Sequence, residues 1–228
     1  MTLKEAILAR HSVRCYRKKP LAVGIVKVLE EKIAELNRVG NLHIQLITNE
    51  PRAFSGMMAR YGRFRGVNDY IVIAGKKSDD LDERAGYFGE QLVLYAQTLG
   101  LNTCWVGLNY SKIAGTYVLA EDEKIVCYIA IGYGVTQGGA HKTKSVSEVS
   151  NVSSETPAWF REGVEAALLA PTAINQQKFS FTYEGLRDGV YKVQAKRGHS
   201  LIGYTHIDLG IAKFHFEVGA GRQNFEWL

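Results

Sequence analysis

The sequence predicts a globular protein of mixed helices and strands. Of its 228 residues, 46% are apolar, which is enough for a sizeable core in one large domain or two small ones. Apolar residues recur at helical spacing in several long segments, and short apolar or alternating runs between those segments are typical of strands. The elements can therefore be placed in order along the chain.

The first half begins with a short amphipathic helix, which Thr2 and Glu5 start as a capping box. A helix is expected over Val23–Arg38, and Gly40 ends it. The other expected elements are strands at Leu42–Thr48, Tyr70–Ala74, Asn102–Val106 and Ile125–Ile131, a long helix from Asp80 or Asp82 to Leu99, and a shorter helix around Ser111–Leu119.

The second half follows the serine-rich stretch Val149–Glu155, which is the best linker candidate and divides the chain into residues 1–150 and 151–228. Thr156 and Pro157 begin a helix that runs to about Leu169. Asp188-Gly189 lies between two strand-like runs, so a hairpin is expected. The runs and the last helix are Phe179–Glu184, Val190–Ala195 and Thr205–Val218.

Charge and cysteine content narrow the classes of protein. The net charge of +5 permits an acidic ligand or nucleic acid, but 23 acidic residues are mixed with 28 basic ones. Cys15, Cys104 and Cys127 are too widely spaced for a disulfide framework or a zinc site, which favours a reducing cytoplasm and no bound metal. No apolar stretch reaches the length of a membrane span, so no membrane partner is expected.

The basic turn, Arg10-His11-Ser12-Val13-Arg14, is a candidate anion site. Two guanidinium groups and a hydroxyl at alternate positions can receive a phosphate or another oxyanion, although spacing alone favours a solvated turn. The segment Arg60–Arg65, with aromatic residues between arginines, is weak evidence for single-stranded nucleic acid. Gly132-Tyr133-Gly134 fails as a dinucleotide fingerprint, because Gln137 replaces the third glycine and a basic loop replaces the helix.

The two halves also show a faint duplication. Val26–Thr48 and Val164–Tyr183 both read as helix, loop and strand. Two long helices also correspond, with Gly89 and Gly210 in similar places. Only the first half carries the basic turn, and only the second carries the loop Ala170-Pro171-Thr172-Ala173-Ile174-Asn175-Gln176-Gln177. Each half thus has what the other lacks, which no purely structural reading predicts.

Together these motifs resemble the FMN-dependent nitroreductase superfamily. The resemblance rests on the basic turn, Ala170-Pro171-Thr172 with Asn175 and Gln177, Leu99-Gly100-Leu101 before Cys104-Trp105-Val106-Gly107, and Lys142-Thr143-Lys144. It implies an α+β fold, with a mostly antiparallel central sheet wrapped by helices. The family is dimeric, with flavin at the interface. The placement of the loop in the second half is similar to a duplicated branch in which one chain mimics the dimer, so a monomer is possible.

The resemblance also implies roles for individual residues. Arg10, Ser12 and one of Lys142 or Lys144 would hold the flavin phosphate, and His11 would meet the ribityl chain. Arg14 would lie near N1 and the C2 carbonyl, and the backbone N–H groups of Val106 and Gly107 would face N5. The residues that would contact or pack against the flavin from elsewhere are Trp105, Pro171, Thr172, Ala173, Asn175 and Gln177, with Arg63 or Arg65 a looser candidate at the pyrimidine edge.

The implied activity is a ping-pong hydride transfer from NADH or NADPH through FMN to a small electron-poor acceptor, such as a nitroaromatic or a quinone. One flavin per chain is expected, and no catalytic side chain is needed. Two alternatives stay open: a degenerate flavin-binding protein without activity, and, more weakly, a nucleic-acid-binding module. Singly, each motif also has a structural reading: Trp105 as core, Pro171 as a helix stop, Asn175 as a turn cap and the lysines as a solvated loop.

Overall fold

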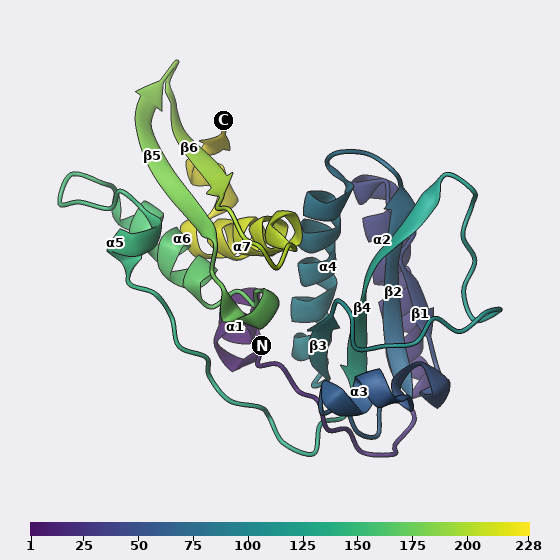
Figure 1. Cartoon of the computed structure of the whole chain (residues 1–228). Coiled ribbons are helices and arrows are strands. Elements are labelled where there is room, and N and C mark those ends of the chain that lie inside the picture. The colour runs from purple at the N-terminus through teal and green to yellow at the C-terminus, as the bar shows by residue number, and fades with distance from the viewer. The chain divides into compact units, whose positions relative to one another are not determined.

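The computed structural model describes all 228 residues and divides them into two compact units (Figure 1). Unit 1 comprises Met1, Ala9–Leu81 and Gln91–Ala140, and unit 2 comprises Thr2–Leu8, Asp82–Glu90 and His141–Leu228. The division of the chain near residue 150 stays a prediction. None of the helices combines the length and the apolar character needed to cross a bilayer.

Unit 1 is built on a four-stranded antiparallel sheet in the order β1-β2-β4-β3 (Figure 1). The strands are β1 (Gln45–Ile47), β2 (Asp69–Lys76), β3 (Asn102–Val106) and β4 (Glu123–Gly132). All residues of β2 except Lys76 are buried. The helix α2 (Val23–Gly40) adds Leu29, Ile33 and Leu36 to the buried residues of the unit, as its helical spacing predicts. The antiparallel sheet with its helices confirms the predicted α+β class.

Aromatic side chains fill much of the core of unit 1. Tyr128 stacks on Tyr70 and on Tyr110, with ring centroids 5.1 Å and 3.8 Å apart. Phe54 packs against Phe64 at 5.2 Å. Phe54 ends the 3₁₀ helix η1 (Pro51–Phe54), and Phe64 follows the short helix α3 (Met57–Tyr61). These contacts hold the connection between β1 and β2 against the sheet.

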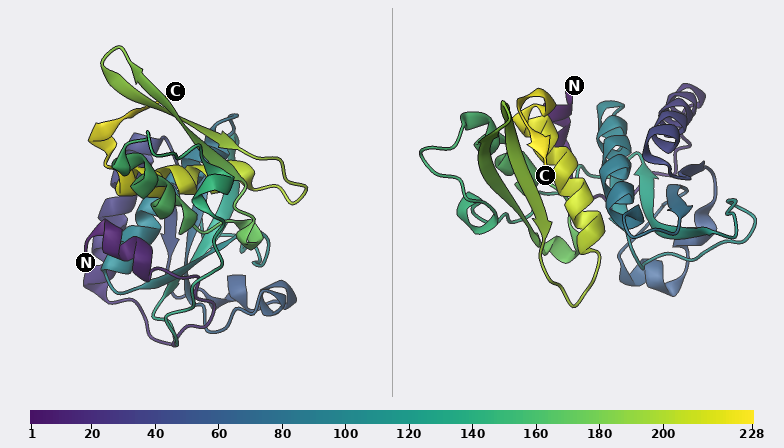
Figure 2. Two further views of the ribbon diagram at one scale, coloured as in Figure 1. Left: turned by 90° about the vertical axis from the view of Figure 1, so that its left-hand side faces the viewer. Right: turned by 90° about the horizontal axis from the view of Figure 1, so that it is seen from above.

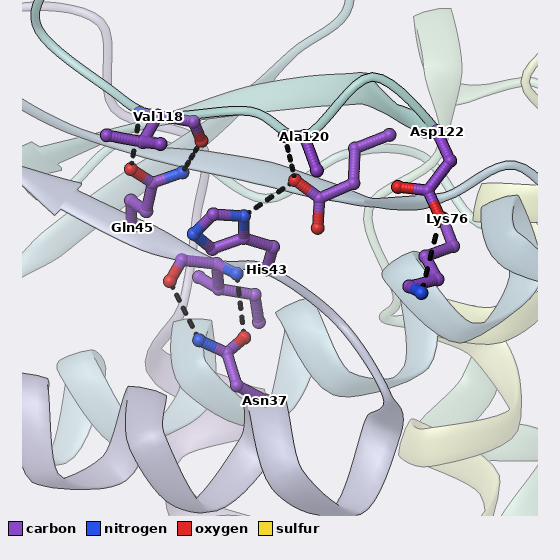
Figure 3. Close-up of polar contacts among 9 residues, drawn as sticks. Asn37, His43, Gln45, Lys76, Val118, Ala120 and Asp122 are labelled. Carbon is purple, nitrogen blue, oxygen red and sulfur yellow. Dashed lines mark hydrogen bonds and ion pairs between the residues drawn. The ribbon is translucent and has the colours of Figure 1, made fainter.

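Two elements of unit 1 differ from their predictions, and a side-chain amide binds the backbone at each place (Figure 3). The Asn37 amide donates to the Ile44 carbonyl and accepts from its N–H, at 2.9 and 2.7 Å, so β1 is shorter than the predicted strand Leu42–Thr48. The Gln45 amide binds both backbone groups of Val118 in the same way. The helix expected around residues 111–119 is wrong, because this stretch is irregular and Gly115 has a φ of +78°.

A second polar contact lies beside these amides. His43 Nδ1 is 2.8 Å from a carboxylate oxygen of Glu123, and the same oxygen accepts the Ala120 N–H (Figure 3). Burial raises the pKa of Glu123, but the hydrogen bonds from His43 and Ala120 together lower it below its usual value. This carboxylate therefore ties the start of β4 to the segment before β1.

Unit 2 contains a second, three-stranded sheet in the order β5-β6-β7. Its elements are the first half of α4 (Leu81–Thr98) with α1 (Leu3–Ala9), α5 (Val146–Val149), α6 (Ala158–Leu168), α7 (Thr205–Ala220), β5 (Phe179–Arg187), β6 (Val190–Arg197) and β7 (Glu226–Trp227). Figure 2 shows α7 alongside the hairpin of β5 and β6. Asp188 and Gly189 both have positive φ, as the predicted two-residue turn requires. The capping box of Thr2 and Glu5 is confirmed.

Within unit 2, α4 and α7 touch through their backbones at two glycines. A Cβ on Gly86 would lie 2.1 Å from the Ile207 carbonyl oxygen, and a Cβ on Gly210 would lie 2.0 Å from that of Glu83. Each glycine thus faces the carbonyl of the residue three positions before the other. Such reciprocity is the pattern of a two-fold contact between equivalent helices.

Candidate functional site

The basic turn in unit 1 is held by neighbouring backbone. Ser12 forms a bridge with Thr103 of β3, and Val13 N donates to the Thr103 carbonyl at 3.0 Å. Arg65 N donates to the Arg14 carbonyl at 2.9 Å, which fixes the other side of the turn. Val13 is buried, whereas Arg14 is exposed. The turn is therefore a built segment of the fold rather than a loose solvated loop.

Three of its polar side chains act on the buried thiol of Cys104. Burial raises the pKa of Cys104, and Arg14, the Ser12 hydroxyl and Arg10 act in the opposite direction, because each favours the negatively charged thiolate. Guanidinium and hydroxyl groups are also the kinds of donor that bind an oxyanion. Cys104 itself is 2% exposed and belongs to the core.

The glycine segment after β4 lies against the basic turn. A Cβ on Gly138, whose φ is +76°, would lie 2.8 Å from the Cβ of His11 and 3.1 Å from the Ser12 carbonyl oxygen. Asn102 holds this segment, because its amide accepts from Gly134 N at 3.0 Å and donates to Gln137 at 2.9 Å. Sequence reasoning missed Gly138 and Asn102. Gly134, which belongs to the segment rejected above as a dinucleotide fingerprint, takes part in this close backbone packing.

The strand β3 carries the remaining predicted residues of unit 1. Val106 is its last residue and is buried, Trp105 is half-buried, and Gly107 begins the bend that follows. Because Thr103 on this strand is bonded to the basic turn, β3 and the turn lie side by side in unit 1.

In unit 2, the basic loop and the loop after α6 form one hydrogen-bonded cluster. The Gln177 amide accepts from Lys144 N at 2.9 Å and donates to the Lys142 carbonyl and to Asn175, at 2.8 and 2.9 Å. Asn175 also donates to the Lys142 carbonyl at 2.8 Å, and the Lys144 ammonium donates to the Gln177 carbonyl at 2.7 Å. Gln177 is 3% exposed, so its side chain holds the cluster together. Lys142 is exposed, which leaves its ammonium group available for a ligand.

The same loop is conformationally strained. Ile174, Asn175 and Gln177 have φ values of +47°, +60° and +45°, in the left-handed region that non-glycine residues rarely adopt. Asp208 in the first turn of α7 holds the loop, accepting from Ala173 N at 2.9 Å and from the Gln176 amide at 2.6 Å. Asp208 is 2% exposed, and burial raises its pKa to about 6 despite these two hydrogen bonds. Strain held by a buried carboxylate is typical of a functional loop.

Comparisons with known proteins identify the family. Residues 2–220 match the family model described as "Putative TM nitroreductase". The chain belongs to this family. The predicted nitroreductase resemblance is therefore confirmed. No curated protein matches the sequence.

Two solved structures show the same nitroreductase fold. A protein of Thermotoga maritima, described as a putative nitroreductase, is 23% identical, with a TM-score of 0.66 over 98% of this chain and 85% of that one. A protein of Desulfovibrio desulfuricans, described as a putative nitroreductase in complex with FMN, is 17% identical, with a TM-score of 0.53 over 69% of this chain and 98% of that one.

In this member of the nitroreductase family, the predicted site residues fall into two groups. Unit 1 holds Arg10, His11, Ser12, Arg14, Trp105, Val106 and Gly107, and unit 2 holds Lys142, Lys144, Pro171, Thr172, Ala173, Asn175 and Gln177. Within each unit, segments distant in sequence are brought together as described. The loosely placed Arg65 is bonded through its backbone to Arg14, so it lies at the edge of the basic turn.

Proposed function

We propose that this chain is a flavin-dependent oxidoreductase, which takes hydride from NADH or NADPH and passes it to a small electron-poor acceptor. The observation that carries the proposal is the basic turn with Arg10, Ser12 and Arg14, which is bonded to β3 in a nitroreductase-family chain. FMN is the cofactor proposed, and the related Desulfovibrio protein is described as its FMN complex.

The residues present fit FMN chemically. Its phosphate carries close to two negative charges, which two guanidinium groups, a hydroxyl and an ammonium can balance and bind. Of the two candidate lysines, Lys142 is the better partner, because the Lys144 ammonium is committed to the Gln177 carbonyl. Arg10 is 3% exposed, and a buried guanidinium of this kind suits a fixed anion better than bulk water.

When bound, FMN supplies the ring that accepts and gives up hydride. The chain's own residues bind and orient this group. Arg10, Ser12 and Lys142 would hold the phosphate, and Arg14 would supply a positive charge to the flavin. Further contacts come from His11, Trp105, the backbone of Val106 and Gly107, Pro171, Thr172 and Ala173. Asn175, Gln177 and Lys144 act by positioning the loop, since their amides and ammonium group are hydrogen-bonded to one another and to nearby carbonyls.

Internal duplication is part of the proposal. Apart from α3, both halves of the chain have the order helix, strand, strand, helix, strand: α2-β1-α3-β2-α4-β3 and α6-β5-β6-α7-β7. The reciprocal contact of Gly86 and Gly210 supports equivalence of α4 and α7. Because only one half carries the basic turn, we propose one FMN per chain and a chain that can act as a monomer. The three free cysteines support a reducing cytoplasm as its compartment.

The visible absorption spectrum of the purified protein tests this function. We expect a flavin band that bleaches when NADH or NADPH is added without oxygen and that returns when a nitroaromatic or quinone is added. Bound flavin that neither nucleotide bleaches would favour a binding protein without activity. A protein that takes up no FMN, yet binds oligonucleotides with a steep salt dependence, would favour the nucleic-acid alternative.

A further inference from the structure

A pocket of unit 1 adjoins the basic turn, and the only candidate FMN contacts that it contains are the loosely placed Arg63 and Arg65. Its volume is about 570 Å³, and it is lined by Phe54, Ser55, Arg60, Arg63, Phe64, Arg65 and Gly66. The guanidinium carbon of Arg14 lies 5.9 Å from the centre of the Phe64 ring, which connects the pocket to the basic turn. A cavity of this size admits a small molecule rather than a folded partner.

The three arginines of the pocket have no anionic partner within the chain. Arg60, Arg63 and Arg65 are exposed and form no side-chain hydrogen bond or ion pair, whereas Arg52 nearby in the sequence is paired with Glu50. Like charges that face one pocket repel each other, and an anion bound among them relieves that repulsion. Each guanidinium can also donate two parallel hydrogen bonds to a carboxylate or phosphate.

The loop that carries these arginines is fixed before any ligand binds. Arg63 has a φ of +62°, and its N–H donates to the Arg60 carbonyl at 2.9 Å. Gly62 packs so closely on Asn109 that a Cβ would lie 2.8 Å from it. Phe64 is 5% exposed, and its N–H donates to the Ala59 carbonyl at 2.9 Å. A loop constrained in this way loses little entropy when it binds an anion.

The lining also indicates which part of a ligand the pocket would meet. Phe54 and Phe64 are only 6% and 5% exposed, so the three guanidinium groups are the accessible feature of the lining, and an anionic group is the part of a ligand that they would bind. Electron-poor acceptors with a carboxylate carry such a group, and so does a nucleotide with an additional phosphate.

We propose that this pocket binds the anionic group, carboxylate or phosphate, of the small-molecule redox substrate, and so selects negatively charged substrates. The proposal rests on the proposed function, because it assigns to the pocket one part of a molecule whose reacting part meets FMN. The anionic group has two candidate sources, the additional phosphate of NADPH or a carboxylate on the acceptor.

Arg60→Gln tests the pocket, and Arg38→Gln is the control because it removes the same charge from an exposed position of α2 outside the pocket. In the FMN-loaded enzyme, KM is compared for NADPH against NADH and for 4-nitrobenzoate against 4-nitrotoluene. Calorimetry of 2′-AMP and 4-nitrobenzoate with the purified protein measures binding without turnover. FMN affinity is measured in each variant.

We expect Arg60→Gln to weaken the anionic member of at least one pair by about tenfold, the usual effect of losing one charge-assisted hydrogen bond. Affinity for the neutral member and for FMN should not change, and Arg38→Gln should leave every value unchanged. The proposal is overturned if neither pair responds, if FMN affinity falls equally, or if a single-stranded oligonucleotide displaces the small anions more effectively than they displace it. If the protein takes up no FMN, the proposed function fails, and calorimetry alone decides whether the pocket binds anions.

Discussion

Asp208 provides a sharp test of how the strained loop of unit 2 is held. The carboxylate is 2% exposed and accepts from Ala173 N and the Gln176 amide. Burial raises its pKa to about 6, from an ordinary value of 3.8. Because the folded state binds this proton more tightly than the unfolded chain, the contribution of Asp208 to stability is greatest below about pH 4 and is lost as pH rises through about 6. The shift of about two pKa units corresponds to a loss of about 3 kcal/mol.

Asp208→Asn removes this titration while retaining an acceptor for Ala173 N. Urea unfolding is followed by tryptophan fluorescence between pH 4 and 7, since Trp159 and Trp227 both lie in unit 2. We expect the free energy of unfolding of the native protein to fall by about 3 kcal/mol relative to the variant over that range. Asp188→Asn, at the exposed hairpin turn, controls for the loss of a carboxylate. A difference between Asp208→Asn and the native protein that does not change with pH would refute this account of Asp208.

Three further predictions follow from the packing and the loop. Gly210→Ala should destabilise unit 2 by at least about 3 kcal/mol in urea unfolding, because its Cβ would lie 2.0 Å from a carbonyl oxygen. Gly24→Ala is the control: a Cβ there would have nothing within 4 Å, so this variant should stabilise α2 by about 0.5 kcal/mol. An equal response of both variants would contradict the close helix contact. Gln177→Leu should lower stability by about 2 kcal/mol and weaken FMN binding about tenfold in a fluorescence titration, and unchanged FMN binding would separate the loop from the site. Lys142→Ala should weaken FMN binding about tenfold without loss of stability, whereas Lys144→Ala should mainly lower stability. The reverse result would exchange the roles of the two lysines.

Elements with a strong local signal could be predicted from the sequence. The periodicity of α2, the Asp188-Gly189 turn and the final helix required no knowledge of distant contacts. The predicted helix around residues 111–119 and the full length of β1 were wrong because side-chain amides of Asn37 and Gln45 bind backbone groups there. The strand β7 has two residues and pairs with β6 far along the chain, so no local pattern marks it.

In the candidate site, too, the residues with a local sequence motif could be predicted and those that act through distant contacts could not. The basic turn and the proline-threonine loop were found because their residue types form recognisable motifs. Asn102, Gly138 and Asp208 were missed, since each acts through a contact with a residue far away or through backbone closeness that appears only in the fold. Their signals in the sequence are an ordinary asparagine, glycine and aspartate. The arginine pocket was noticed only as an isolated basic segment, because its shape depends on the packing of Phe54 and Phe64.

The most direct test of the central claim is the stoichiometry and affinity of FMN, measured by titration of the apoprotein. Arg14→Ala removes a charge from unit 1 and Lys142→Ala removes one from unit 2, and both side chains are exposed. We predict one FMN per chain and weaker binding, by about tenfold, in each variant. Two FMN molecules per chain, or one variant that retains full affinity while the other loses it, would contradict the proposed single FMN site.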